Sequence, residues 1–222
     1  METTKIPIPT IPSSRRPGQN PYLEQLLDNR LINIDGGGYQ DYKDCLRRSM
    51  ARGEFCKTFA WAIPNNQAIE TIARYSPIVE IGAGGGYWAM LLRDKGVDVI
   101  CYDKNPPNVK LDASKSESWS QVLWSEVLKG GSTQAGKYPD RALFLCWPPY
   151  RQNMADNALR HYLKAGGKTI IYVGETKWGC CANEKFFSRL KKNFTLEEYV
   201  SIPVWDSIHD QLFVWTRKEE SV

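Results

Sequence analysis

The stretch VEIGAGGGYW, residues 79–88, decides which fold this sequence predicts. An apolar segment, PIVEIG at 77–82, runs directly into a cluster of glycines, and an amphipathic segment, GYWAMLLRDKG at 86–96, follows. Glycine at such a junction allows a sharp turn and a close approach to a ligand, because no Cβ stands in the way. The pattern predicts a strand, a tight turn and a helix, with a ligand at the carboxyl end of the strand.

An acidic residue closes the next predicted strand. VDVICYD, residues 97–103, ends in Asp103, 21 residues after Gly82. That spacing suits a carboxylate that binds the two ribose hydroxyls of a nucleoside. A plain strand-to-helix turn without a ligand is the structural alternative. A dinucleotide loop, GxGxxG, would need glycine where the sequence has Tyr87, which disfavours a nucleotide or dinucleotide enzyme.

Strands and helices alternate on both sides of this junction. Strands are predicted at 77–82, 97–103, 121–127, 142–147 and 168–175, and helices at 86–96, 154–167 and 183–193. Two closing strands, 195–205 and 210–218, are separated by a short turn, which can join only antiparallel neighbours. The sequence thus predicts an α/β fold: a Rossmann-like, seven-stranded, mostly parallel sheet with helices on both faces and an antiparallel last strand.

The N-terminal part differs in composition from this alternating region. Residues 1–20 are rich in Pro, Ser and Arg and predict a flexible arm. Residues 21–62 predict an N-terminal helical extension or lid, with Asn20 as the cap of its first helix. DGGGY at 35–39 breaks the chain before a helix at 39–61, whose apolar stripe is expected at Tyr42, Leu46, Met50 and Phe59. The sheet domain is expected at 63–218.

Composition places bounds on the kind of protein. The 222 residues are 42% hydrophobic and 24% charged, and 29 basic against 25 acidic residues give a net charge of +4, too mild to demand a polyanionic partner. No apolar run approaches a membrane span and the start of the chain lacks a hydrophobic signal core, so we expect a cytoplasmic protein that does not contact membranes. None of the six cysteines forms a CxxC pair, which favours reduced thiols and no metal site; they are Cys45, Cys56, Cys101, Cys146, Cys180 and Cys181.

The glycine loop, the acidic strand end CYD and the closing hairpin together resemble the class I S-adenosylmethionine-dependent methyltransferases. The resemblance covers about residues 63–218. It implies S-adenosylmethionine as the cofactor and places the cofactor contacts at Glu80, Gly82, Ala83, Gly84, Gly86, Tyr87 and Asp103. Contacts to the adenine would fall between Leu111 and Trp124, where the sequence does not single out residues.

A second motif, WPPY at 147–150, ends the predicted strand ALFLCW and should face the same crevice. Two prolines fix φ and are expected to leave their carbonyls free as acceptors, and Tyr150 offers a flat face for stacking. The motif resembles the Asn/Asp/Ser-Pro-Pro-aromatic motif of amino-methyltransferases, which Pro148, Pro149 and Tyr150 match. Trp147 departs from it, because the family has a polar side chain there. A Pro-Pro loop that only shapes the fold is the alternative.

A base would be needed if the acceptor were a hydroxyl. His209, between Asp206 and Asp210 in the closing turn, is the candidate, although a turn role is the commoner one for such residues. The predicted catalytic residues are therefore Trp147, Pro148, Tyr150 and His209. Further residues expected at strand ends are Glu175, Trp178 and Trp205.

The preferred function is methyl transfer to a nitrogen of a small amine or nitrogen heterocycle, with the N-terminal helices as a lid. A nucleic-acid base is one alternative acceptor, although Arg47, Arg48 and Arg52 are expected to face plain solvent. A methyltransferase-like binding module without catalysis is the other alternative, and the substitution at Trp147 supports it.

Overall fold

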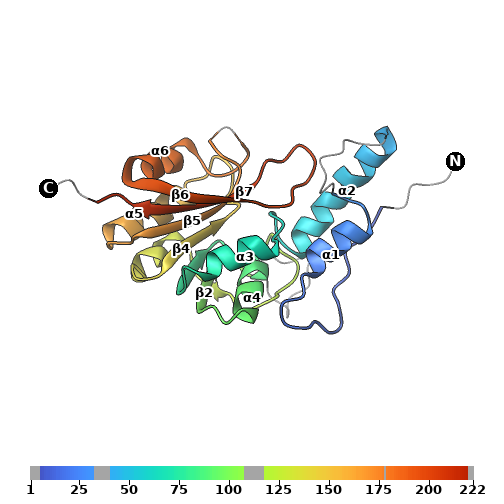
Figure 1. Ribbon diagram of the computed structural model, residues 1–222, viewed down its shortest axis with the longest axis horizontal. Helices are drawn as coiled ribbons and strands as arrows, with labels where there is room; N and C mark the ends of the chain where they lie inside the picture. The colour runs from blue at the N-terminus through green and yellow to red at the C-terminus, as the bar shows by residue number, and fades with distance from the viewer. Residues whose placement is uncertain (1–5, 33–40, 108–117, 178, 220–222) are drawn as a thin grey trace.

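The computed structural model describes residues 6–32, 41–107, 118–177 and 179–219 (Figure 1). Its helices are α1 (Pro21–Asp28), α2 (Tyr42–Thr58), α3 (Asn66–Ala73), α4 (Tyr87–Asp94), α5 (Met154–Lys164) and α6 (Glu184–Asn193), with the 3-10 helix η2 at Ser132–Lys137. Its strands are β1 (Ile78–Ile81), β2 (Val99–Asp103), β3 (Leu128–Lys129), β4 (Ala142–Cys146), β5 (Thr169–Gly174), β6 (Phe194–Ser201) and β7 (Gln211–Arg217).

All the strands form one seven-stranded sheet in the order β3-β2-β1-β4-β5-β7-β6. Strand β1 pairs in parallel with β2 and β4, whereas β7 is antiparallel to both β5 and β6. The short connection from β6 to β7 explains this reversal, because a parallel neighbour would need a long crossover. The predicted Rossmann-like sheet with an antiparallel last strand is confirmed, and this strand order is that of the class I methyltransferase fold.

Each face of the sheet has its own hydrophobic core. Side chains alternate along β4, so that Phe144 faces one core while Leu143 and Leu145 face the other. Residues of α1, α2, α3 and α4 join the first core, and residues of α5 and α6 join the second. The predicted helices on both faces are therefore confirmed. The strand order reverses between β1 and β4, because β2 and β3 lie on one side of β1 and β4 and β5 on the other, and ligands bind at the carboxyl ends of the strands at such a point.

The third strand does not lie where the sequence predicts it. Residues 121–127 are wrong as a strand, since β3 follows them at Leu128–Lys129. They run back over the glycine loop instead: the backbone N–H of Trp124 donates to the Gly85 carbonyl at 2.8 Å, and its indole N–H donates to the Thr58 carbonyl at 2.6 Å. The apolar residues of this segment cover the loop and the end of α2 rather than pairing in the sheet.

The apolar stripe predicted on α2 is wrong in three of its four positions. Tyr42, Leu46 and Met50 are 79%, 47% and 52% exposed, and only Phe59, just after the helix, is buried. The face turned inward carries Ala51 and Phe55 among others.

Arg48 lies on that buried face as well, so its predicted exposure to solvent is wrong. Its guanidinium forms ion pairs with Asp44 at 2.9 Å and with Asp206 at 3.5 Å, and the residue is 4% exposed. A paired arginine can occupy an inward position that a sequence pattern assigns to an apolar residue.

The N-terminal segment contacts the sheet domain. Arg15 forms a bidentate ion pair with Asp94 at the end of α4, with distances of 2.5 and 3.0 Å. Asn20 caps α1 as predicted, and the hydroxyl of Tyr87 at the start of α4 accepts from the Tyr22 backbone N–H at 3.0 Å. These contacts hold α1 beside the carboxyl end of β1, at the end of the molecule where Figure 1 shows α1 and α2. The domain boundaries at 20 and 62 stay predictions.

Across the part of the chain that the structure describes, no helix combines the length and apolar character that crossing a membrane requires. The same residues contain no group of three or more histidine, cysteine or acidic side chains placed to hold a metal ion.

Candidate functional site

The loop between β1 and α4 has a backbone that glycine adopts readily. Gly82, Gly84 and Gly86 have φ values of +83°, +54° and +73°, in the left-handed region that side chains disfavour. Gly82, Ala83 and Gly84 line a cavity of about 600 Å³ at the carboxyl ends of β1, β2 and β4. That volume lies within the range of about 300–1,000 Å³ that is usual for small-molecule and cofactor sites.

Asp103 closes β2 directly beside this loop. One carboxylate oxygen accepts the Gly84 backbone N–H at 2.9 Å, and the other accepts the Asn105 backbone N–H at 2.8 Å. Each carboxylate oxygen has two lone-pair directions, so one on each oxygen stays available for a hydroxyl donor. Asp103 also lines the cavity. The side chain thus orders the glycine loop and can still bind a vicinal diol.

Glu80 is a buried carboxyl group at the inner end of the same cavity. It is 2% exposed, and among the described residues its Oε2 has no hydrogen-bond partner. Burial raises the pKa of Glu80 to about 8, although Arg93 opposes the rise. Unpartnered buried carboxyl groups are costly, so a positively charged ligand group at this point would complement the site.

Two of the predicted cofactor contacts, Gly86 and Tyr87, have a role in packing or in hydrogen bonding within the fold. Gly86 is not a lining residue: a Cβ there would lie 2.8 Å from Cγ2 of Val127, so its lack of a side chain serves packing. Tyr87 does line the cavity, but its hydroxyl donates to Asn20 at 2.8 Å and accepts from Tyr22. Its hydroxyl group is therefore committed to holding α1.

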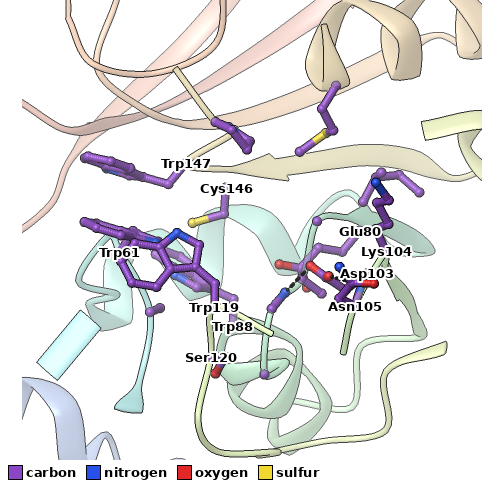
Figure 2. Close-up of a pocket in the computed structure, with 18 of the residues that line it drawn as sticks. Trp61, Glu80, Trp88, Asp103, Lys104, Asn105, Trp119, Ser120, Cys146 and Trp147 are labelled. Carbon is purple, nitrogen blue, oxygen red and sulfur yellow. Dashed lines mark hydrogen bonds between the residues drawn. The ribbon is translucent and has the colours of Figure 1, made fainter. Parts of the chain in front are cut away.

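The cavity has two chemically different ends, which Figure 2 shows on opposite sides of Cys146. The glycine-loop end carries the polar and charged residues, Glu80, Asp103, Lys104 and Asn105. The tryptophan end is lined by Trp61, Trp119 and Trp147, and Pro149 and Tyr150, which follow Trp147 in the sequence, also line the cavity. A ligand that spans the cavity would place a polar part at the first end and a flat apolar part at the second.

Trp147, Pro149 and Tyr150 of the WPPY motif line the same cavity as the glycine loop, whereas Pro148 does not, and both proline carbonyls accept hydrogen bonds. The Pro148 carbonyl accepts the Ala182 backbone N–H at 2.9 Å, and the Pro149 carbonyl accepts that of Gln152 at 3.3 Å. The two carbonyls are therefore bound rather than free as the sequence predicts, although each keeps one lone-pair direction for a further donor. Tyr150 is 51% exposed, and the Arg151 guanidinium lies 4.9 Å from its ring centroid.

Trp61 and Trp119 are site residues that the sequence analysis missed. Trp61 stacks on Trp147, with ring centroids 4.8 Å apart and an angle of 11° between the planes, and Trp119 meets Trp61 edge-on at 4.6 Å (Figure 2). Both lie outside any recognisable motif, Trp61 after α2 and Trp119 before the segment that covers the glycine loop. The one signal available in the sequence is its high tryptophan content, eight residues, which are spread along the chain.

His209 does not join the other predicted catalytic residues. Its side chain is 84% exposed and does not line the cavity. Its backbone N–H donates to Oε1 of Glu175 at 3.0 Å. Burial raises the pKa of Glu175, but hydrogen bonds from Cys180 and His209 outweigh it and hold that pKa below its ordinary value. Trp205 is a core residue that donates to the Tyr22 hydroxyl, and Trp178 lies outside the described residues.

The residues at the glycine-loop end fit S-adenosylmethionine. Glu80 presents an unpartnered carboxyl oxygen that an ammonium group would satisfy. Gly84 leaves the loop without a side chain where the cavity begins, and Asp103 retains acceptor capacity for hydroxyls. These three features provide for an amino acid group and a ribose in one ligand.

Comparison with known proteins finds a distant similarity in sequence to an RNA methyltransferase. No family model matches the chain. A ribosomal RNA large subunit methyltransferase E from Wolbachia sp. subsp. Brugia malayi is 24% identical over 137 residues, which is 55% of this chain and 59% of that enzyme. The match thus represents less than two thirds of the relative's length.

Two solved structures overlap more loosely. Magnesium protoporphyrin IX methyltransferase from Synechocystis PCC 6803 with bound SAH is 10% identical, covers 90% of this chain and 97% of its own, and has a TM-score of 0.45. The 1,6-didemethyltoxoflavin-N1-methyltransferase of Burkholderia thailandensis is 13% identical, covers 69% and 78%, and has a TM-score of 0.41. At these TM-scores, the class I methyltransferase fold rests on the strand order of the sheet itself.

Proposed function

We propose that this protein is an S-adenosylmethionine-dependent methyltransferase that methylates a nitrogen of a small amine or nitrogen heterocycle. The observation that carries the proposal is the single cavity that joins the glycine loop and Asp103 to the WPPY motif. A cofactor held at the first end would face an acceptor held at the second.

The residues of the chain would divide the task between the two ends. Glu80, the glycine loop and Asp103 would hold the cofactor, which supplies a methyl group already activated on a sulfonium. Pro149 and Tyr150 would orient the acceptor, and the surrounding tryptophans would exclude water. Alignment of the two reactants provides most of the rate acceleration in such a transfer. A strong base is therefore not required when the acceptor is a neutral amine.

The exposed position of His209 agrees with nitrogen as the nucleophile. A hydroxyl acceptor would need a base within hydrogen-bond reach of the reacting atom. Three buried carboxyl groups lie in this part of the fold: Glu80 is at the cofactor end, Glu175 accepts backbone donors, and Asp210 accepts the Trp147 indole N–H. An unprotonated amine or ring nitrogen can attack without any of them.

A base in RNA is the second candidate for the acceptor. The similarity to a ribosomal RNA methyltransferase favours it, and a base extruded from RNA could stack on the exposed ring of Tyr150. The side chains of Lys104 at the cavity and Arg151 beside Tyr150 could then contact phosphates.

Calorimetry and turnover test these proposals in sequence. We expect S-adenosylmethionine and its demethylated product S-adenosylhomocysteine to bind, and NAD not to bind. Methyl transfer is then followed with radiolabelled cofactor against small amines, nitrogen heterocycles and a pool of unmodified RNA. Failure of both cofactors to bind would overturn the assignment. Binding without turnover on any substrate class would leave a cofactor-binding module in place of an enzyme.

A further inference from the structure

The backbone of Trp147 is unusual for so large a residue. Its φ is +49°, in the left-handed region, immediately after β4. Such a conformation is strained for a residue with a side chain and persists only where surrounding contacts impose it. One of these contacts is the backbone hydrogen bond from Trp147 N–H to the Val173 carbonyl at 2.8 Å. The side chain must supply others.

The indole of Trp147 has a specific polar partner. Its Nε1–H donates to Oδ2 of Asp210 at 2.7 Å, across 63 positions of sequence. Asp210 lies just before β7 and is 4% exposed, and among the described residues its Oδ1 has no hydrogen-bond partner. A buried carboxyl group with one accepted hydrogen bond is a rigid but costly anchor, so its retention at this position needs a reason.

The anchored indole in turn supports a residue of the N-terminal extension. Trp61 stacks on Trp147 at 4.8 Å, and the Arg52 guanidinium lies 5.5 Å from the Trp61 centroid and 5.6 Å from the Trp147 centroid. Nearly equal distances place the guanidinium beside the stacked pair rather than over one outer face. Arg52 is thus a partner of the tryptophans and not the solvent-facing residue that the sequence predicts.

We infer that Asp210 is a positioning residue, which fixes the Trp147 indole, and through it Trp61, as a preassembled wall of the tryptophan end. The polar slot of the WPPY motif is filled by an indole whose own polar group is turned away from the cavity to Asp210. The wall then offers ring surface to an acceptor and no hydrogen-bonding side chain at position 147. Its consequence for acceptor binding rests on the proposed function, whereas the anchoring itself does not.

Protonation of Asp210 should weaken the anchor, because a hydrogen bond to a charged acceptor is stronger than one to a neutral acceptor. Burial raises the pKa of Asp210 to about 7, opposed by the Trp147 hydrogen bond and reinforced by Glu175. Other titratable or charged groups interact with Asp210 from the neighbouring elements: Arg52, Cys56, Cys146, Tyr172, Cys180, Cys181 and His209.

The test uses the indole N–H signals of the full-length protein without any ligand, in a ¹H–¹⁵N spectrum. The Trp147 signal is assigned by its loss in Trp147→Phe. We expect Asp210→Ala to speed hydrogen exchange at the Trp147 indole at least tenfold and to shift the Trp61 signal, while Asp210→Asn, which keeps an acceptor, retains most of the protection. The Trp205 indole donates to the Tyr22 hydroxyl and is the internal reference.

Unchanged exchange and an unchanged Trp61 signal in a folded Asp210→Ala variant would overturn the inference. If Asp210→Ala does not fold, the comparison is made in the Trp147→Phe background. There the indole donor is gone, so Asp210→Ala should cost little further stability. A full additional loss of stability in that background would also overturn it. Because no cofactor or acceptor is present, failure of this test is distinguishable from failure of the proposed function.

Discussion

Glu80→Gln should make the stability of the protein less dependent on pH. Burial raises the pKa of Glu80 from 4.5 to about 8, so the folded state holds this proton more tightly than the unfolded chain does. The stabilisation from Glu80 is complete below about pH 4.5 and is lost as pH rises toward 8. At about 1.4 kcal/mol per pKa unit, the whole change corresponds to about 5 kcal/mol. Glutamine keeps the shape of the side chain and removes the titration.

Urea unfolding of the ligand-free protein at pH 5.5 and pH 8.5 measures the contribution of Glu80 to the free energy of unfolding. The wild type should lose about 3 kcal/mol more of its free energy of unfolding over this interval than Glu80→Gln does. Asp210 titrates in the same window, but it is present in both proteins and its contribution cancels in the difference. Equal losses in the two proteins would refute the claim that Glu80 is buried with its proton.

The same carboxyl group gives a signature of cofactor binding. An ammonium group beside Glu80 would favour the ionised carboxylate, so binding at pH 7 should release close to one proton per site. Calorimetry of S-adenosylhomocysteine in buffers of different ionisation enthalpy counts that proton. Glu80→Gln should bind more weakly and release none. Binding of the wild type without proton release would place the ammonium group away from Glu80.

Three further substitutions address the two ends of the cavity. Asp103→Ala should weaken cofactor binding by about 1.5–3 kcal/mol, through lost hydroxyl contacts and a loosened loop, and calorimetry showing unchanged affinity would contradict this. Gly84→Val should abolish cofactor binding, whereas the matched control Gly96→Val, with φ +77° on open surface, should only cost stability. Tyr150→Ala should slow methyl transfer, because it removes stacking worth about 1–3 kcal/mol, while Tyr150→Phe keeps the rate and both variants keep the cofactor affinity. Equal turnover of Tyr150→Ala and the wild type would argue against stacking.

The sheet could be predicted because its information is local. The strand-to-helix junction at 79–88, the acidic strand end and the short final turn each restrict the topology within a few residues. The failure at 121–127 has the opposite cause. That segment is apolar because it covers the glycine loop, through the contact of Trp124 with Gly85, and a pattern of hydrophobicity does not say which neighbour an apolar residue meets.

The burial of polar side chains could likewise not be predicted from the sequence. Arg48 occupies an inward position on α2 because Asp206, far along the chain, lies opposite it. The rule for amphipathic helices places apolar side chains toward the core, and it therefore predicts that Tyr42, Leu46 and Met50 are buried. Pairing between distant charges reverses the amphipathic rule, and a single sequence does not reveal the pairing.

Trp147 shows how these two kinds of information combine at the site. The motif located the residue at the end of β4, and its departure from the polar pattern raised the alternative of a protein without catalysis. The partner Asp210 and the stacked Trp61 come from opposite ends of the chain, so only the folded structure brings the three together. With its polar group held outside the cavity, the indole extends the flat surface of the tryptophan end. The substitution is therefore compatible with an enzyme whose acceptor is recognised by ring surface rather than by a hydrogen bond at position 147.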